Sequence, residues 1–153
     1  MVRHRSPQVP GAEMVRRVEV TQATLDRFIG RPFAWGSADC GQLAAFHLKG
    51  MGHRLVLTKW GRYRTALGAA KAMKRAGYAD LSAVLDGMGL DRIPPAAVLP
   101  GDMLALPREE SATFEALTVA VGNGRVLGFY GEGAAVLQPV MFETAWRVPC
   151  RKS

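Results

Sequence analysis

Residues 31–43 read Arg31-Pro32-Phe33-Ala34-Trp35-Gly36-Ser37-Ala38-Asp39-Cys40-Gly41-Gln42-Leu43, and this stretch decides the fold. Its first half is rich in turn-forming residues, and apolar residues recur at helical spacing after its end. The pattern predicts a helix with Asp39 as N-cap and Cys40 in the first turn. Unpaired N–H groups and the helix dipole favour a thiolate at such a position. Cys40 is therefore a candidate nucleophile.

The composition around this stretch indicates one globular domain with a real core. The chain has 153 residues, of which 48% are hydrophobic and 22% charged, and this is the size of a single domain. No run of about 18 apolar residues could span a membrane, and the N-terminus lacks the apolar core of a signal peptide. The two cysteines, Cys40 and Cys150, lie far apart. We expect free thiols in a reducing cytoplasm, and no cofactor or metal.

The N-terminal residues 1–17 are predicted to form an extended basic arm, and residues 18–153 a single domain. The arm contains Pro7, Pro10 and Gly11 and several arginines, with few large apolar groups. Two roles stay open for it: docking onto a neighbouring subunit, or a disordered tail.

The order of the predicted elements indicates an α+β fold, with helices first and a small antiparallel sheet afterwards. Thr21 is a candidate cap of the first helix, and Gly122-Asn123-Gly124 is typical of a tight hairpin turn. The expected helices span about residues 20–30, 40–50, 65–76 and 80–85. The expected strands lie within residues 98–106, 116–121 and 125–130, with 135–137 and 144–148 as further candidates.

A strongly basic segment lies in the middle of the chain, because no acidic residue occurs between Asp39 and Asp80. Such a segment can attract nucleic acid, an acidic envelope or an acidic partner subunit, or it can simply be a solvated helix face. No nucleic-acid-binding motif accompanies it, so we expect no specific nucleic-acid binding. The candidate interaction residues are Arg54, Lys59, Arg62, Arg64, Lys71, Lys74 and Arg75.

Three pieces of the chain together resemble the NlpC-type papain-like cysteine peptidases of bacterial cell walls and phage tails. They are the stretch 31–36 followed by Asp39-Cys40, then Pro100-Gly101-Asp102, and the hairpin around Gly122-Asn123-Gly124. The resemblance implies a papain-like fold over roughly residues 21–148, with Cys40 as nucleophile. The short Asp-Cys version and its Ala-rich helix are most similar to a branch found beside phage and prophage tail genes.

The resemblance also shows where this chain departs from the family. The family's catalytic His falls on Ala116, and the polar residue that orients it falls on Gly128. An alanine cannot move a proton, and a glycine cannot orient an imidazole. A shift of one residue would bring Glu115 or Leu117 into line, and neighbouring strand residues face opposite sides of a sheet.

The remaining histidines offer few substitutes for the missing base. His47 lies two helical turns after Cys40, about 10 Å along the axis, which is too far for a hydrogen bond. His53, in the following loop, is the weak candidate for a migrated base, and His4 lies in the arm. The alternative for each is a surface or partly buried side chain without a catalytic role. The alternative for Cys40 is a small buried apolar residue that packs the helix against the sheet.

These observations lead to two main hypotheses. The first is a structural component of a phage or prophage tail, near the tip or baseplate. It would be made in the bacterial cytoplasm, carried in the virion and bound to other tail proteins, with a symmetric ring as one such arrangement. The second is an active cysteine peptidase that cleaves peptidoglycan during phage entry. A nucleic-acid-binding module is a weaker third possibility.

Overall fold

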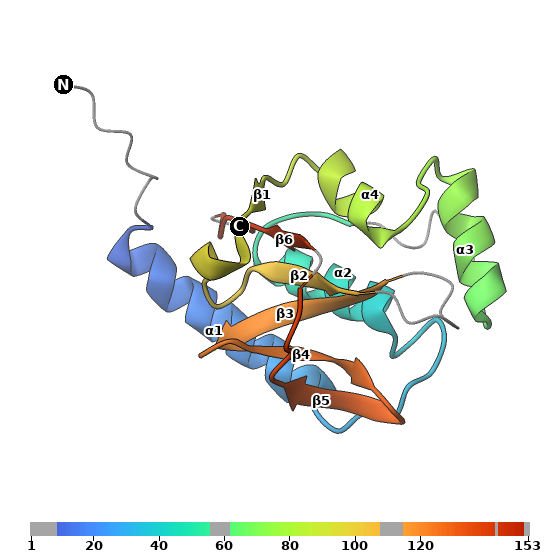
Figure 1. Ribbon diagram of the computed structural model, residues 1–153, viewed down its shortest axis with the longest axis horizontal. Helices are drawn as coiled ribbons and strands as arrows, with labels where there is room; N and C mark the ends of the chain where they lie inside the picture. The colour runs from blue at the N-terminus through green and yellow to red at the C-terminus, as the bar shows by residue number, and fades with distance from the viewer. Residues whose placement is uncertain (1–8, 56–61, 108–114, 143, 152–153) are drawn as a thin grey trace.

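The computed structural model describes residues 9–55, 62–107, 115–142 and 144–151. In this part of the chain, helices and a single antiparallel sheet form the α+β arrangement predicted from the sequence (Figure 1). The elements are α1 (Gly11–Phe28), α2 (Cys40–Gly50), α3 (Ala66–Arg75), α4 (Leu81–Gly87), β1 (Arg92–Ile93), the 3-10 helix η2 (Pro95–Ala97), β2 (Met103–Leu106), β3 (Ala116–Gly122), β4 (Arg125–Tyr130), β5 (Gly133–Leu137) and β6 (Thr144–Trp146). The strand order in the sheet is β1-β6-β2-β3-β4-β5.

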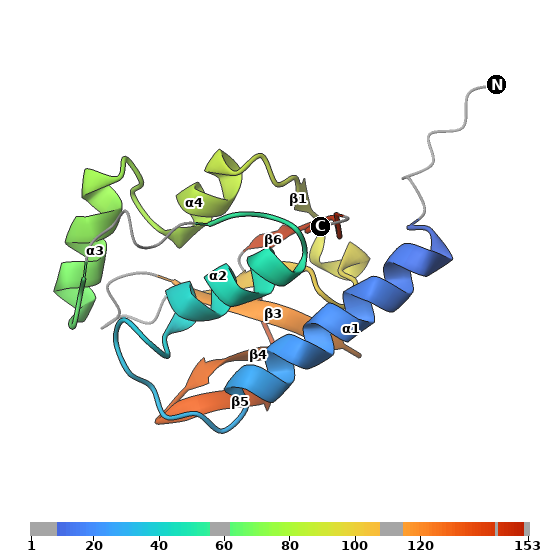
Figure 2. The ribbon, with the colours of Figure 1, turned by 180° about the vertical axis from the view of Figure 1, so that it is seen from behind.

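Two helices, α1 and α2, cover the same face of the sheet (Figure 2). The main core lies between them and the sheet, where Leu43 and Leu48 of α2 pack in one cluster with Leu117 of β3 and Trp146 of β6. A smaller apolar cluster around Leu104 covers the opposite face. Because side chains alternate along a strand, each strand residue belongs to one of these two layers.

Helix α1 corrects the prediction of an arm over residues 1–17. It begins at Gly11, and Arg17 lies within it with a fully buried side chain. The buried face of α1 includes Arg17, Thr21 and Thr24, so its helical stripe is largely polar and an apolar pattern cannot reveal it. Thr21 is therefore a mid-helix residue whose hydroxyl donates to the carbonyl of Arg17 at 2.7 Å, not a cap. Residues 1–8 lie outside the described residues.

Side-chain caps fix the starts of the next three helices, and the sequence predicted the first of these caps, Asp39. The carboxylate of Asp39 accepts the N–H of Gln42 at the start of α2. Thr65 and Asp80 play the same role for α3 and α4. Each cap satisfies an N–H that has no partner within its helix. The position of Cys40 as the first residue of α2 is therefore set by local sequence.

The predicted hairpin joins β3 and β4. Gly122, Asn123 and Gly124 have φ values of 106°, 55° and 72°, all in the left-handed region, which explains the glycines on both sides of the turn. None of the described helices combines the length and the apolar character that crossing a bilayer requires.

Candidate functional site

Asp39 organises the turn that leads into Cys40. One carboxylate oxygen accepts the N–H of Gln42 at 2.9 Å, and the other accepts the N–H of Gly36 at 2.8 Å. Gly36 has φ of 82°, and a Cβ there would lie 2.9 Å from the carbonyl oxygen of Tyr63. Asp39 is itself buried, so its charge is held by backbone donors. It acts as a structural cap, and both of its carboxylate oxygens accept hydrogen bonds within the domain.

The thiol of Cys40 is kept protonated by its surroundings. Burial raises its pKa from 9.0 to about 12, while the backbone N–H of Leu117 lowers it by less and the charge of Asp39 raises it further. The expected thiolate is therefore wrong at neutral pH, because desolvation outweighs the donors and dipole of the helix start. Cys40 as a whole is half-buried and packs against the main core, so it also meets the description of a packing residue.

A narrow hollow lies beside Cys40. Tyr63 closes one side, and its hydroxyl donates to Asp39 at 3.3 Å. Burial and the charge of Asp39 raise the Tyr63 pKa well above its ordinary value, so this phenol stays protonated. The side chains around the hollow are mainly apolar, and they are Trp35, Asp39, Cys40, Gly41, Tyr63, Ala69, Met73 and Leu81. None of these groups is a base near neutral pH apart from the already engaged carboxylate.

The two strand positions matched to the family's base and its orienting residue do not face Cys40. Leu117 packs in the same core as Cys40, so its neighbour Ala116 points to the other face of the sheet. Gly128 of β4 lies on that other face beside Thr118, because a Cβ at Gly128 would be 2.6 Å from the Thr118 methyl. The β3 residue that faces Cys40 is thus Leu117, which has no group for proton transfer.

Neither described histidine reaches Cys40. His47 is fully buried, with Nδ1 2.8 Å from the Thr24 hydroxyl and Nε2 2.8 Å from the Gly101 carbonyl. His53 follows the far end of α2, about 15 Å along the helix from Cys40, and its Nε2 contacts the carbonyl of Pro149. The structure therefore does not bring together the candidate nucleophile and the candidate base. His4 lies outside the described residues.

Glu115 approaches Cys40 closely enough for its charge to raise the thiol pKa, yet it is occupied elsewhere. Its Oε1 accepts the N–H groups of Leu81 and Ser82 at 2.9 and 3.3 Å. Burial and the nearby charge of Asp80 raise its own pKa. Glu115 thereby attaches the start of α4 to the start of β3, and this structural role is one that sequence reasoning missed.

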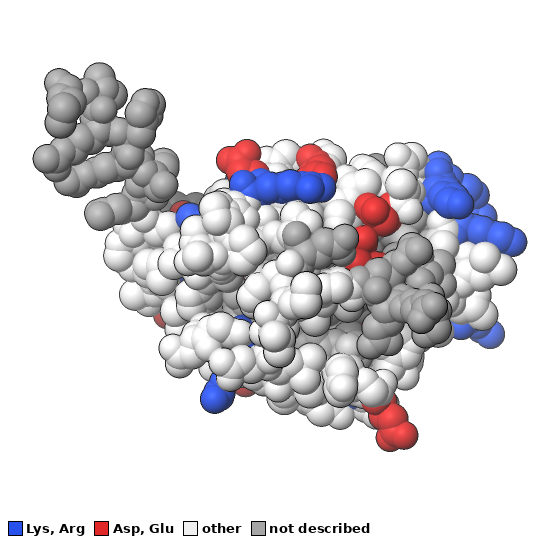
Figure 3. All heavy atoms as spheres, viewed as in Figure 1, with Lys and Arg blue, Asp and Glu red and all other residues white. Residues whose placement is uncertain are grey.

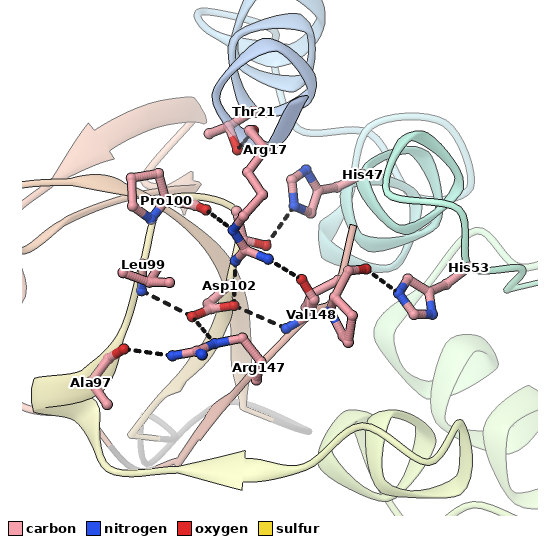
Figure 4. Close-up of polar contacts among 12 residues, drawn as sticks. Arg17, Thr21, His47, His53, Ala97, Leu99, Pro100, Asp102, Arg147 and Val148 are labelled. Atoms are coloured by element: carbon pink, nitrogen blue, oxygen red, sulfur yellow. Dashed lines mark hydrogen bonds and ion pairs between the residues drawn. The ribbon is translucent and has the colours of Figure 1, made fainter. Parts of the chain in front are cut away.

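A second polar centre, also missed, forms around Asp102 (Figure 4). Asp102 is fully buried and accepts four hydrogen bonds. One oxygen accepts from Arg17 at 2.6 Å and from the N–H of Val148 at 2.9 Å. The other accepts from the N–H of Leu99 and from Arg147, both at 2.9 Å. The signal for this centre was the Pro100-Gly101-Asp102 motif, whose polar residue had no predicted partner.

The other N–H groups of the Arg17 guanidinium donate hydrogen bonds to backbone carbonyls. They donate to Pro100 at 3.1 Å and also to Val148. Pro100 and Val148 belong to segments far from α1 in sequence, so one side chain joins three parts of the chain. Because every group is paired, this centre, which we call the Arg17–Asp102 cluster, holds the fold and presents no reactive atom.

The predicted interaction residues are partly gathered by the fold. Lys71, Lys74 and Arg75 are exposed on α3, where Figure 3 shows a basic region at one end of the molecule. Arg62 and Arg64 are exposed in the segment before α3, and Arg54 is exposed after α2. Lys59 lies outside the described residues. Within the described ranges, no group of three or more potential ligands could hold a metal ion.

Comparison with known proteins gives one family. No curated protein matches the chain. The family described as Domain of unknown function (DUF6950) matches residues 15–148, which is most of the chain. The protein therefore belongs to this family.

Proposed function

We propose that this member of the DUF6950 family is a non-catalytic structural component of a phage or prophage tail, built on a degenerate NlpC-type papain-like fold. The observation that carries the proposal is the state of Cys40, whose thiol is buried with a pKa of about 12. Both described histidines are held by carbonyl groups elsewhere. A cysteine hydrolase needs a thiolate and an imidazole within hydrogen-bond reach, and the described residues supply neither.

The tail assignment is supported by sequence resemblance and by surface charge. The Asp39-Cys40 version of the motif is most similar to the branch that accompanies phage tail genes. The net charge of +7 and the acid-free segment between Asp39 and Asp80 suit contacts with acidic neighbouring subunits. In this role, the former nucleophile helix serves as a packing element between the sheet and α1. The ancestral fold alone does not define a function.

The test of lost catalysis compares wild-type protein with Cys40→Ala on purified peptidoglycan. We expect neither protein to release peptide stems. Release by the wild type alone would overturn the non-catalytic reading. The test of location is mass spectrometry of purified phage particles from the host that encodes the chain. The protein should be present in stoichiometric amounts in tails, and its absence from particles would contradict a virion role.

The second candidate is an active cysteine peptidase that cleaves peptidoglycan during phage entry. It is favoured by the position of Cys40 at the start of α2, beside a hollow, with the N–H of Leu117 directed at its sulfur. Such donors could hold an oxyanion. A partner chain would have to provide the base, because His53 lies too far away. Peptidoglycan release that requires both a tail partner and Cys40 would establish this alternative.

A further inference from the structure

The outward face of α3 carries a regular stripe of exposed side chains. Arg64, Leu67, Lys71 and Lys74 follow one another at spacings of three, four and three residues, and all four are exposed. The first precedes the cap Thr65, and the other three lie in α3. Within α3 this spacing places Leu67, Lys71 and Lys74 on one side of the helix, while Arg64 is an exposed residue just before the extended cap Thr65. We call these four residues the α3 stripe.

The opposite side of α3 faces the interior. Ala69, Ala72 and Met73 are buried there, so packing fixes the helix in one orientation and holds the α3 stripe toward solvent. The α3 stripe is thus presented toward solvent at one end of the molecule, where Figure 3 shows blue side chains.

The positive charge of the α3 stripe is not compensated within the described chain. Lys71 and Lys74 form no ion pair with any residue that the structure describes. The nearest following acid in sequence, Asp80, caps α4 through the N–H of Ala83 at 2.8 Å. An ordinary exposed helix often places Glu four residues from Lys, whereas the sequence from 40 to 79 contains no acidic residue. Within the described residues, Lys71 and Lys74 face solvent and have no acidic partner.

Leu67 distinguishes between kinds of partner. It is 62% exposed in the middle of this basic surface, and an apolar centre within a charged rim is typical of protein–protein contacts. Nucleic acid would favour stacking aromatics, and the aromatic residue nearest the stripe in sequence, Tyr63, is buried. We propose that the α3 stripe docks onto an acidic protein surface that has an apolar depression at its centre. The identity of that surface as a neighbouring tail subunit rests on the proposed function, but the docking chemistry does not.

The experiment uses the full chain and three defined probes. The first is a synthetic amphipathic helix with glutamates flanking a leucine-lined face. The second is the same helix with its leucines replaced by serine, and the third is a short DNA duplex. Fluorescence anisotropy measures the dissociation constant for each probe at several salt concentrations. Circular dichroism of every variant verifies that the surface substitutions leave the fold intact.

Two double variants remove the same charge from different places. Lys71→Gln with Lys74→Gln acts on the α3 stripe, whereas Lys49→Gln with Arg125→Gln acts on exposed residues elsewhere. We expect the first to weaken binding of the acidic leucine helix about tenfold and the second by less than about twofold. Leu67→Ser should weaken binding of the leucine helix several-fold while leaving the serine helix unaffected.

Three outcomes would overturn the docking proposal. Equal losses of affinity for the acidic leucine helix in the two double variants would show that binding depends on net charge and not on the α3 stripe. Tighter binding to the DNA duplex, lost with the α3 double variant, would identify a nucleic-acid surface instead. Absence of binding to either helix would remove the surface altogether. None of these outcomes bears on peptidoglycan cleavage, so failure of the docking proposal remains separable from failure of the non-catalytic role.

Discussion

The two ends of α2 differ in sequence and in surroundings. The start of the helix carries a recognisable sequence motif, whereas the last turn lies beside a buried polar cluster that the sequence did not predict. Cys40, at the first residue, lies in a sequence pattern that predicts a nucleophile, yet its thiol is protonated and no described residue beside it can serve as a base. His47, two turns later, contacts Gly101 beside the buried Arg17–Asp102 cluster. No sequence pattern predicted the partners in that cluster, and its charged groups are paired with one another in the structure. The comparison shows that the role of a buried polar group depends more on its hydrogen-bond partners than on its residue type.

The largest effect is expected at Asp102. Asp102→Asn removes the charge that pairs with Arg17, while the fully buried guanidinium remains. Leaving one partner of a buried ion pair without the other costs about 3–5 kcal/mol. Urea unfolding should therefore show a loss of that size in the free energy of unfolding, or failure to fold.

The matched control for Asp102 is Asp86→Asn. Asp86 pairs with Arg92 at 2.7 Å, but both side chains are largely exposed, so the loss should be about 1 kcal/mol or less. Similar losses in the two variants would show that the Arg17–Asp102 cluster is not the stabilising centre described here.

The next effect concerns the reactivity of Cys40. A pKa of about 12 instead of 9.0 leaves roughly a thousandfold less thiolate at neutral pH. In a Cys150→Ser background, iodoacetamide should modify Cys40 about a thousand times more slowly than a free peptide thiol. Mass spectrometry of timed samples measures the rate. Modification as fast as that of the peptide thiol would show that Cys40 is a reactive thiol. The proposed difference between the two ends of α2 would then be wrong.

A somewhat smaller effect is expected from His47 as pH changes. Because Gly101 offers only an acceptor, neutral His47 donates from Nε2. Its Nδ1 lies 2.8 Å from the Thr24 hydroxyl, whose one proton is shared between Nδ1 and the Val20 carbonyl at 3.0 Å. Burial lowers the pKa of His47 from 6.5 to about 4. Between pH 6.5 and 4 the unfolded chain therefore binds a proton at His47 that the folded protein does not bind. The contribution of neutral His47 to the free energy of unfolding is complete above pH 6.5 and is lost as pH falls toward 4. The loss is about 3 kcal/mol.

The pH experiment compares wild type with His47→Gln by urea unfolding across pH 4 to 7. The difference between the two proteins isolates His47, because Glu115 has a raised pKa and acts in the opposite direction. The stability that protonated Glu115 contributes to the fold is lost as pH rises from its unfolded pKa through its raised folded pKa. His47→Gln should remove most of the acid-side slope, and an unchanged slope would refute the neutral buried imidazole.

The smallest effect tests Gly128, the strand position where the resemblance to NlpC-type peptidases predicts an orienting residue. Gly128→Ala places a Cβ 2.6 Å from the Thr118 methyl, and such overpacking costs about 1–3 kcal/mol. Adding Thr118→Ser removes the methyl but keeps the hydroxyl that donates to Leu104 at 2.9 Å, so the double variant should recover most of the loss. A Gly128→Ala protein as stable as wild type would show that this face has room for a side chain.

Sequence predicted those parts of the fold that depend on local chemistry. Asp39 caps its helix by accepting the N–H three residues further on, and such a contact requires no knowledge of the rest of the chain. The helix starts near Thr65 and Asp80 were also expected, and each has the same kind of cap in the structure. The turn at 122–124 likewise depends on residues that tolerate positive φ. The two-residue strand β1 was missed, because only its pairing with β6 defines it.

The parts that sequence could not predict depend on distant contacts. Arg17 was assigned to an arm because arginines are usually exposed, and only Asp102, 85 residues away, makes its burial favourable. Cys40 was located correctly, yet its protonation depends on burial against Leu117 of β3. His47 was expected to be a surface or partly buried residue, and its two partners come from α1 and the turn before β2.

The junction of Arg17 with Val148 has a consequence for synthesis on the ribosome. These residues are 131 positions apart, and Asp102 binds both of them. A nascent chain that has not yet released residue 148 from the exit tunnel leaves Arg17 and Asp102 without their last partners. Contacts of such long sequence separation form late. The polypeptide therefore completes its core only after residue 148 has left the tunnel, and products that stop before this residue should be open to proteases.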